Sequence, residues 1–494
     1  MENVNNLDAL LIFPNNRRSA YGGVTAEIAA VTPPVQCGLL AAYLRSKGFS
    51  VDVLDADARG CSPEQAGQIV ATRRPRLVVI STDHVNSADV TKMGAAGETA
   101  RAIHAAAPDV PVLLEGVVPS AYPERILQEE GADWVCQGEA YVPVESLLRS
   151  MPASARRGDA LPPSPGLWGI TRGGELIRGG RVPMVQDVTA LPRTAWDLIP
   201  PANYRAHHWH CFDRLSERSP YAALFTSFGC PYNCSYCSVN VVAGKPNLRS
   251  RSVDDILDEM VWLQRECGVR NLRILDNVFT ARADRVEELC DRIISAGLDF
   301  NMWAYARVET VRDPALLVKM KKAGVNWLAY GIESANQKVR ADVKKNTDLA
   351  SIEKVLEQTQ SAGIHIVGNF IFGLPEDDMS TMQMSFDMAK HYNFEWANFY
   401  CAMAYPGTAL YDDMIRQGAS LPSAWSAYSQ YSADSHPLAT RHLAARDVQA
   451  FRDRAFEEYY SSPRYLQMLE TKFGPDAVAY VKHILSQPLR REKR

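Results

Sequence analysis

Two blocks of the sequence alternate short apolar segments with amphipathic segments, and this alternation restricts the fold more than any other feature. In the first block, apolar segments of strand length occupy residues 9–14, 51–55, 77–81, 110–116 and 134–136. Helical patterns separate them at 37–48, 64–72, 88–106 and 122–130. This order predicts a parallel, doubly wound, Rossmann-like (flavodoxin-like) sheet that binds ligands beyond the carboxyl ends of its strands.

The second block repeats the alternation from about residue 220 to 410. Its expected strands are 221–227, 271–276, 300–305, 327–331, 365–372 and 396–402. Intervening helical stretches include 252–264, 282–296, 314–323 and 349–362. Repeated βα units of this length predict a partial (β/α)6 barrel with its active site at the carboxyl ends of the strands.

The length of 494 residues requires more than one domain. We expect an α/β protein with a sheet domain at 1–150, a linker at 151–219, a barrel at 220–410 and a helical region at 411–494. Residues 152–180 are rich in Pro, Gly and Arg, which indicates a linker or a small hairpin. From about residue 443, apolar residues recur at helical spacing.

Composition excludes several functional classes. The net charge of −4 gives no electrostatic reason to expect nucleic acid or an anionic membrane as a partner. Apolar runs are too short for a spanning helix, and the N-terminus lacks a secretory signal pattern. Only three of the ten cysteines cluster, which favours a metal site in a reducing compartment, and we expect a cytoplasmic protein.

The clustered cysteines lie in the stretch 227–237, which reads SFGCPYNCSYC. Cys230, Cys234 and Cys237 have CxxxCxxC spacing and follow an apolar strand pattern. Three thiolates on one short loop can bind three irons of a cubane cluster and leave the fourth iron open for chemistry. The alternatives are a structural zinc knuckle that lacks a nearby fourth ligand, or a chance grouping.

This loop, with Tyr236 before its last cysteine, resembles that of the radical S-adenosylmethionine (SAM) family. The first block resembles the cobalamin-binding domain of the class B members in Pro33-Pro34, in the strand entry ending at Asp133 and in Gly138-Glu139. The stretches 275–280 (LDNVFT) and 404–411 (AYPGTALY) are similar to those of the same subclass. The resemblance covers residues 8 to about 411 and implies three cofactors: a [4Fe-4S] cluster, SAM and cobalamin.

The resemblance also implies contacts for SAM at the strand ends of the barrel. Asp276 would accept from the ammonium group, Arg307 would pair with the carboxylate, and Glu333 with Ser334 would hold the ribose. The other expected cofactor contacts here are Tyr236, Asn369 and Ile371. The family's usual Gly-Gly-Glu is replaced by the stretch 275–280, which puts the ammonium contact in question. The alternative for each residue is a polar strand end in a surface network.

Cobalamin would contact the strand ends of the first block, which read Ser81-Thr82, Glu115-Gly116 and Gly138-Glu139. The stretch 15–22 has no histidine where other cobalamin proteins carry a cobalt ligand, and Asp57 stands in a similar outline further on. His84 follows a strand end and is either a polar loop residue or a neighbour of the corrin. The alternative is an accessory domain without a cofactor.

The connector carries His207, His208, His210 and Cys211, which invite a zinc interpretation. No partner pair follows at ligand spacing, so we expect a surface turn or the rim of the substrate mouth.

Together, the resemblance implies a C-methyltransferase that acts on a specialised metabolite or a lipid-type precursor. A 5′-deoxyadenosyl radical would abstract hydrogen from an unactivated carbon, and methylcobalamin would deliver the methyl group. A small-molecule substrate and a reductant such as flavodoxin or ferredoxin would be the partners. The alternatives are an oxidative cyclase or ring-rearranging enzyme with the same cofactors, and a non-catalytic iron-sulfur redox or binding protein.

Overall fold

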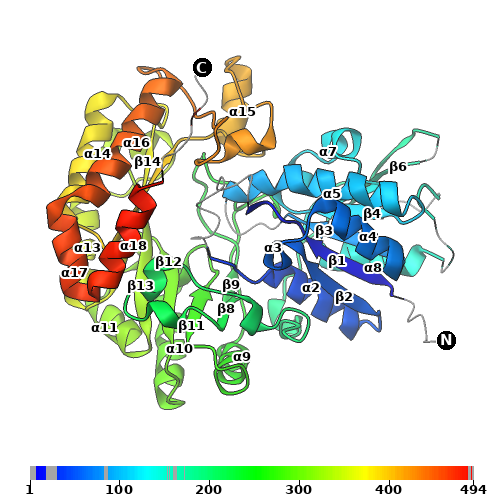
Figure 1. The fold of residues 1–494 in the computed structure, drawn as a ribbon, viewed down its shortest axis with the longest axis horizontal. Coiled ribbons are helices and arrows are strands. Elements are labelled where there is room, and N and C mark those ends of the chain that lie inside the picture. The colour runs from blue at the N-terminus through cyan, green and yellow to red at the C-terminus, as the bar shows by residue number, and fades with distance from the viewer. Residues whose placement is uncertain are drawn as a thin grey trace.

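The computed structural model describes residues 7–17, 30–82, 87–152, 154, 156–159, 164–171, 173–487 and 491. The chain forms two α/β halves that lie side by side (Figure 1). The N-terminal half is blue to cyan, and the second half runs from green to red.

The N-terminal half is built on one seven-stranded sheet in the order β2-β1-β3-β4-β5-β6-β7. Its parallel strands are β1 (Ala9–Phe13), β2 (Val51–Asp55), β3 (Leu77–Ser81), β4 (Val112–Glu115) and β5 (Trp134–Cys136). The helices include α2 (Val35–Ser46), α4 (Pro63–Arg73), α5 (Lys92–Ala106), α7 (Pro123–Glu129) and α8 (Tyr141–Ser150). Helices cover both faces of the sheet, and the order 2-1-3-4-5 is that of the expected flavodoxin-like fold.

Two parts of this half add to the sequence expectation: a helix that was not expected, and the connector, which takes the hairpin form of its two expected alternatives. The helix α8 was not expected, and its buried face packs Val144 and Leu147 into the core. The connector forms a hairpin, β6 (Leu167–Ile170) and β7 (Leu176–Arg178), and β6 pairs antiparallel with β5. The hairpin therefore extends the first sheet.

The second half is the expected partial barrel of six parallel strands in the order β8-β11-β12-β13-β14-β15. The strands are β8 (Tyr221–Leu224), β11 (Asn271–Ile274), β12 (Asn301–Ala306), β13 (Val325–Glu333), β14 (His365–Phe372) and β15 (Trp396–Cys401). Its outer helices include α9 (Val253–Arg265), α10 (Ala283–Ser295), α11 (Pro314–Lys322), α13 (Leu349–Ser361) and α14 (Met379–Tyr392). The end strands β8 and β15 do not pair, so the barrel is open on one side.

The C-terminal region is helical, as expected. It comprises α15 (Ala409–Arg416), α16 (Ala445–Ser461), α17 (Pro463–Phe473) and α18 (Pro475–Leu485). Phe451 of α16 meets the Phe372 ring at 4.9 Å between centroids. Tyr460 donates to the Ala397 carbonyl at 2.7 Å. These contacts seal the β15 side of the open barrel, where Figure 1 shows α16 to α18 in orange and red.

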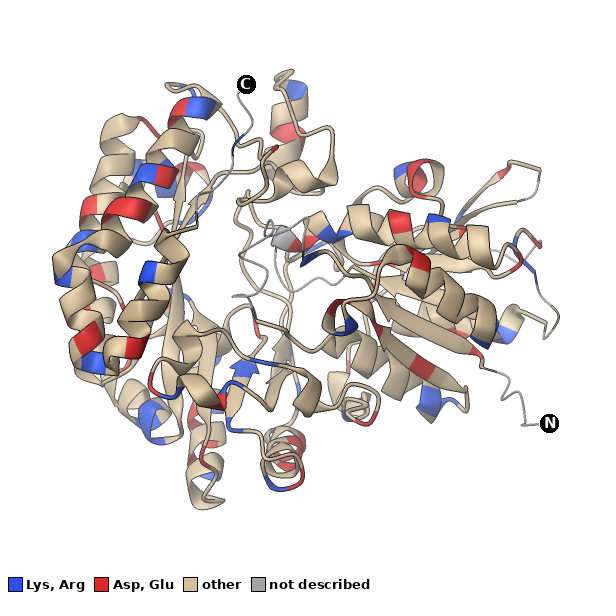
Figure 2. Ribbon diagram, viewed as in Figure 1, with Lys and Arg blue, Asp and Glu red and all other residues tan. Residues whose placement is uncertain are grey.

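Charged residues of both signs are intermingled over the outer helices of both halves (Figure 2). Within the described part of the chain, no helix combines the length and the apolar character needed to cross a membrane.

Candidate functional site

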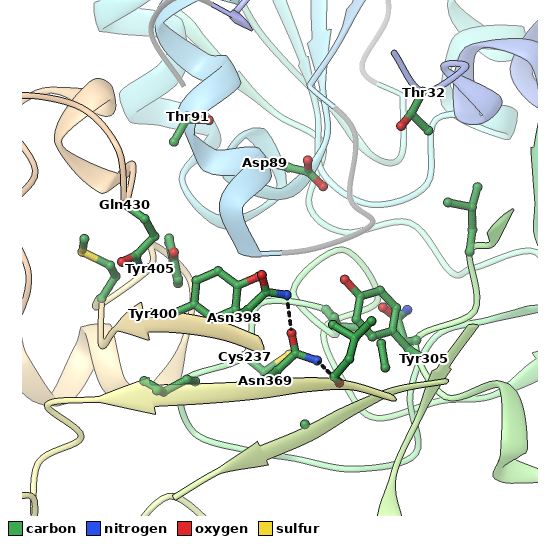
Figure 3. A pocket seen from close by; sticks show the side chains of 18 of the residues that line it. Thr32, Asp89, Thr91, Cys237, Tyr305, Asn369, Asn398, Tyr400, Tyr405 and Gln430 are labelled. Carbon is green, nitrogen blue, oxygen red and sulfur yellow. Dashed lines mark hydrogen bonds between the residues drawn. The ribbon is translucent and has the colours of Figure 1, made fainter. Parts of the chain in front are cut away.

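One cavity of about 660 Å³ lies where the carboxyl ends of the two sheets face each other. Thr32 and Asp89 line it from the N-terminal half, while Cys237, Tyr305 and Asn369 line it from the second half (Figure 3). Both halves therefore contribute side chains to the same space, as expected for ligands held at carboxyl strand ends.

The cysteine loop is held in a fixed shape at the mouth of the barrel. A short antiparallel pair, β9 (Ser227–Phe228) and β10 (Arg249–Ser250), brackets it. Gly229 has φ +85, and a Cβ there would lie 2.2 Å from the amide oxygen of Asn247. Only glycine fits this turn, and Asn247 N–H then donates to the Cys230 carbonyl at 3.0 Å.

Cys230, Cys234 and Cys237 are half-buried, and all three line the cavity. Burial raises the pKa of Cys230, and it raises the pKa of Cys237 to about 12. A metal that binds these thiols must therefore displace their protons. Among the described residues, no three His, Cys, Asp or Glu side chains converge on one point that could hold a single metal ion. The three thiols of one loop provide the donor set of a cubane cluster, in which each cysteine would bind a different iron.

Arg307 links the cysteine loop to the barrel. Its Nη1 donates to Cys234 Sγ at 3.1 Å, and its guanidinium lies 3.8 Å from the centre of the Tyr232 ring. Glu309 accepts from Nε and Nη2 at the other edge of the guanidinium. Arg307 lines the cavity and keeps its charge beside the thiols.

Glu333 is the centre of a second polar group beside the cysteines. It receives hydrogen bonds from Lys345 at 2.7 Å and from Tyr236 at 2.9 Å. Burial, followed by the nearby Glu333 carboxylate, raises the pKa of Tyr236 well above its usual value, so its hydroxyl remains a donor. Glu333 has φ +65, and a Cβ on Gly331 would lie 2.4 Å from its carboxylate oxygen. The backbone here is strained to point the carboxylate into the cavity.

Asp276 and Ser334, two of the residues expected to contact SAM, are fully buried and do not line the cavity. Asp276 accepts from Thr226 N–H at 2.7 Å and from the hydroxyls of Thr226 and Ser227. Ser334 Oγ meets Ser385 Oγ at 3.2 Å, on the side facing α14. Adjacent strand residues point to opposite faces, so Asn277 and Glu333 line the cavity instead.

Asn369 and Ile371 both line the cavity from β14. Figure 3 shows the hydrogen bond in which Asn398 donates to Asn369 at 2.9 Å. Asn369 in turn donates to the Tyr330 carbonyl at 3.1 Å. Trp396 Nε1 donates to Asn398 at 3.0 Å and fixes the orientation of the amides.

The N-terminal residues expected to bind cobalamin lie at the predicted strand ends, but they do not line this cavity. Thr82 bonds to the Glu115 carbonyl at 2.9 Å and ties β3 to β4. Gly138 has φ +121, and its N–H binds Ser120. Glu139 accepts from Arg249 at 2.6 Å. The expected residues at these positions are Ser81, Thr82, Glu115, Gly116, Gly138 and Glu139.

The part of the cavity nearest the first sheet is lined by the connections that follow β1, β2 and β3. Asn16, Thr32 and Thr91 present amide and hydroxyl groups there, which suit a ligand with amide substituents such as a corrin ring. Asp57 also lines the cavity and pairs with Arg17 at 2.8 Å. Residues 18–29 and 83–86, including His84 and most of the stretch 15–22, lie outside the described residues.

The histidine group of the connector is not a surface turn. His210 is buried, and its Nε2 bonds to the Asn301 carbonyl at 2.9 Å. Burial lowers the pKa of His207 and of His210 to about 3. His207 lines the cavity, and its ring stacks on that of Trp209 at 5.5 Å between centroids.

Sequence reasoning missed several lining residues. They are Lys345, Asn398, Tyr400, Tyr405 and Gln430. The period-two alternation along 396–402 could have identified Asn398 and Tyr400 as inward-facing. Lys345, Tyr405 and Gln430 lie in connections between elements, where periodicity carries no such signal.

Two family models match the chain. Residues 21–148 match the B12 binding domain, and residues 224–389 match the Radical SAM superfamily. The matches correspond to the two halves of the structure.

Curated relatives cover most of the chain. An uncharacterized methyltransferase of Pyrococcus horikoshii is 26% identical over 92% of this chain and 93% of its own. Cytidylyl-2-hydroxyethylphosphonate methyltransferase of Streptomyces wedmorensis is 26% identical over 87% of this chain and 88% of its own. Anaerobic magnesium-protoporphyrin IX monomethyl ester cyclase of Rubrivivax gelatinosus is 24% identical over 82% of this chain and 69% of its own.

Among solved structures, the radical SAM methyltransferase TsrM from Kitasatospora setae, with cobalamin and a [4Fe-4S] cluster bound, shares this fold. Its TM-score is 0.70 at 16% identity, over 96% of this chain and 99% of TsrM. The two domain matches, supported by this shared architecture, show that the chain belongs to the cobalamin-binding radical SAM enzymes.

Proposed function

We propose that the protein is a cobalamin-dependent C-methyltransferase that acts on an unactivated carbon of a specialised metabolite or lipid-type precursor. The observation that carries the proposal is the single cavity shared by the cysteine loop and the edge of the first sheet. Methyl transfer to a carbon radical requires both the cluster with SAM and the cobalamin to reach one substrate. Two of the relatives compared above are methyltransferases, which supports the same conclusion.

In this proposal Cys230, Cys234 and Cys237, which all line the cavity, would hold the cluster. When bound, the cluster and SAM supply the radical that removes hydrogen, and cobalamin supplies the methyl group. Arg307, beside Cys234, would pair with the carboxylate of SAM. Glu333, oriented by Lys345 and Tyr236, would accept from the ribose hydroxyls.

The remaining parts of the site would orient the ligands and exclude water. Asn369 and Ile371 would flank the adenine, while Asp276 would fix the base of the cysteine loop through Thr226 and Ser227. We propose that the cobalamin lies against the first sheet, with residues 1–150 and 220–410 as the cofactor domains. A small protein reductant would deliver the electron.

The test is incubation of the anaerobically reconstituted protein with methyl-deuterated SAM, a strong reductant and a fractionated metabolite extract. We expect release of 5′-deoxyadenosine and a product that carries the labelled methyl group. Deoxyadenosine with no labelled product would overturn the methyltransferase proposal and favour a cyclase, an activity that one of the relatives carries. No deoxyadenosine at all would point to a non-catalytic iron-sulfur protein.

Two cysteine variants control this experiment. Cys234→Ala removes one thiol of the loop and should lose iron and deoxyadenosine release together. Cys267→Ala removes a half-buried cysteine after α9 and should keep both at wild-type level. Equal iron content in the two variants would show that the cluster is bound elsewhere.

A further inference from the structure

The inner end of the cavity lies inside the barrel, below the cysteine loop. We call it the inner chamber and define it by its lining residues Trp209, Arg273, Trp303, Tyr305, Trp396 and Tyr480. Trp209 packs against Trp303 at 5.2 Å and against Trp396 at 6.4 Å between ring centroids. Its walls are thus flat and largely apolar.

Arg273 introduces one positive charge into this aromatic chamber. Its guanidinium lies 4.6 Å from the centre of the Trp303 ring and 5.9 Å from that of Tyr305. Its Nε is buried without a hydrogen-bond partner. Within the described part of the chain, no carboxylate pairs with this guanidinium.

The other charges of the cavity are balanced, which makes Arg273 exceptional. The lining carboxylates pair with lining cations as Asp57–Arg17, Asp89–Lys92 and Glu333–Lys345. The two other lining arginines pair with carboxylates behind the wall, as Arg307–Glu309 and Arg452–Asp453. Of the six lysines and arginines among the described lining residues, Arg273 is the one without a carboxylate.

The neighbouring histidine does not offset the positive charge of Arg273. Burial, and then the nearby Arg273, lower the pKa of His207 to about 3, so this histidine is neutral. Arg273 is half-buried, and even partial burial of a cation is unfavourable unless a ligand or a side chain supplies a counter-charge. Aromatic contacts offset only part of that cost.

The position of Arg273 separates its role from that of SAM binding. In register, Arg273 is paired with Trp303, and Arg307 lies four residues further along the chain from Trp303. At about 3.3 Å per residue, the Cα of Arg273 lies about 13 Å below that of Arg307 along the strand direction, and the two guanidinium groups contact different rings, Trp303 and Tyr232. An anion at Arg273 therefore belongs to a different ligand group from one held beside Cys234.

We propose that the inner chamber is the substrate subsite and that Arg273 binds an oxyanion, either carboxylate or phosphoryl, on a flat apolar molecule. This inference rests on the proposed function for the identity of the ligand as substrate. A guanidinium binds either oxyanion through two parallel hydrogen bonds, and the aromatic rings pack against the apolar body.

Anaerobic isothermal titration calorimetry on the fully reconstituted enzyme tests the proposal without turnover. The probes are naphthalene-2-carboxylate, naphthalene-2-phosphonate and neutral naphthalene-2-carboxamide. We expect at least one anion to bind about ten- to a hundredfold more tightly than the amide, as one charge-assisted contact allows. The stronger of the two anions identifies the oxyanion class.

Arg273→Gln should abolish this preference and leave amide binding within about twofold, while Arg273→Lys should retain part of it. Arg17→Gln, which removes a paired cation elsewhere in the cavity, should leave the preference unchanged. A preference that survives in Arg273→Gln, equal binding of anion and amide, or no binding of any probe would each overturn the proposal. These outcomes do not depend on methyl transfer, so they are distinct from failure of the proposed function.

Discussion

At the residue scale, Arg307 shows how one side chain can connect a metal loop to the barrel that carries it. It donates to Cys234 Sγ, pairs with Glu309 and packs on Tyr232. A donor and a positive charge beside a cluster sulfur stabilise the reduced, more negative state of the cluster. Arg307 should therefore influence the electron-transfer step as well as SAM binding.

We expect Arg307→Gln to make the reduction potential of the cluster more negative. One hydrogen bond of about 1 kcal/mol corresponds to about 40 mV for a one-electron couple, and loss of the charge adds to it. A redox titration followed by electron paramagnetic resonance measures the shift. Arg312→Gln, which changes an exposed arginine on the same segment, should leave the potential unchanged. An unchanged or more positive potential in Arg307→Gln would contradict this role.

At the element scale, the end of β13 determines which of two neighbouring polar residues reaches the cavity. The pairing with β14 shifts register between Gly331 and Glu333, where the backbone adopts φ +65. Glu333 consequently faces the cavity, and Ser334 faces α14. The expectation that both would hold the ribose overlooked the alternation of strand residues.

The start of β15 provides a second test at this scale, because Glu395 joins two strands to α17. It accepts from Ile366 N–H at 2.9 Å and pairs with Lys472 at 2.5 Å. Burial raises the pKa of Glu395, but His365 and Lys472 outweigh that effect and lower it to about 2. Its stabilising contribution is therefore complete above about pH 4.5 and is lost as the pH falls toward 2.

We expect Glu395→Gln to lower the free energy of unfolding by roughly 2 kcal/mol at pH 7, after allowance for the exposed Lys472. Urea denaturation should show a smaller difference from wild type at pH 3, where part of the contribution is already lost. The control Glu470→Gln removes an exposed carboxylate of α17 and should have little effect at either pH. A difference that is independent of pH would argue against an ionic role for Glu395.

At the scale of the whole molecule, the relative position of the two halves is what builds the cavity. Glu139, after β5, binds Arg249 of β10 at 2.6 Å, and both side chains are largely buried. Tyr204 of the connector donates to Asp55 at the end of β2 at 3.0 Å. These contacts hold the edge of the first sheet against the cysteine loop.

We expect Glu139→Gln to weaken this contact between the two halves, because it leaves the buried Arg249 without its carboxylate. The cost should be roughly 3 kcal/mol, seen as a lower urea midpoint and faster proteolysis of the connector. Arg178→Gln breaks the exposed pair with Glu124 and should cost less than about 0.5 kcal/mol. Loss of cobalamin binding with unchanged stability and proteolysis would instead favour the cofactor contact predicted for Glu139 from the sequence.

Much of the architecture could be read from local patterns. The strands at 51–55 and 77–81 match β2 and β3 residue for residue, since the alternating pattern of the first and the continuous apolar run of the second need no distant information. The helix α8 was missed although its buried residues follow helical spacing, because Pro143 in its first turn resembles a helix-breaking signal. The connector hairpin was left open, because edge strands beside loops carry a weak pattern.

The sequence by itself determined the two α/β halves, the three-cysteine loop and the family resemblance, because each depends on residues close together in the chain. Only the tertiary structure decided which strand-end residues share the cavity. That depends on which face of the strand each side chain occupies, on the register between strands and on the contacts between the two halves. In the tertiary structure, Asp276 and Ser334 do not line the cavity, and Arg273 is the one described lining cation that has no paired carboxylate. Charge balance within a cavity is a property of three-dimensional neighbours, and no spacing along the chain encodes it.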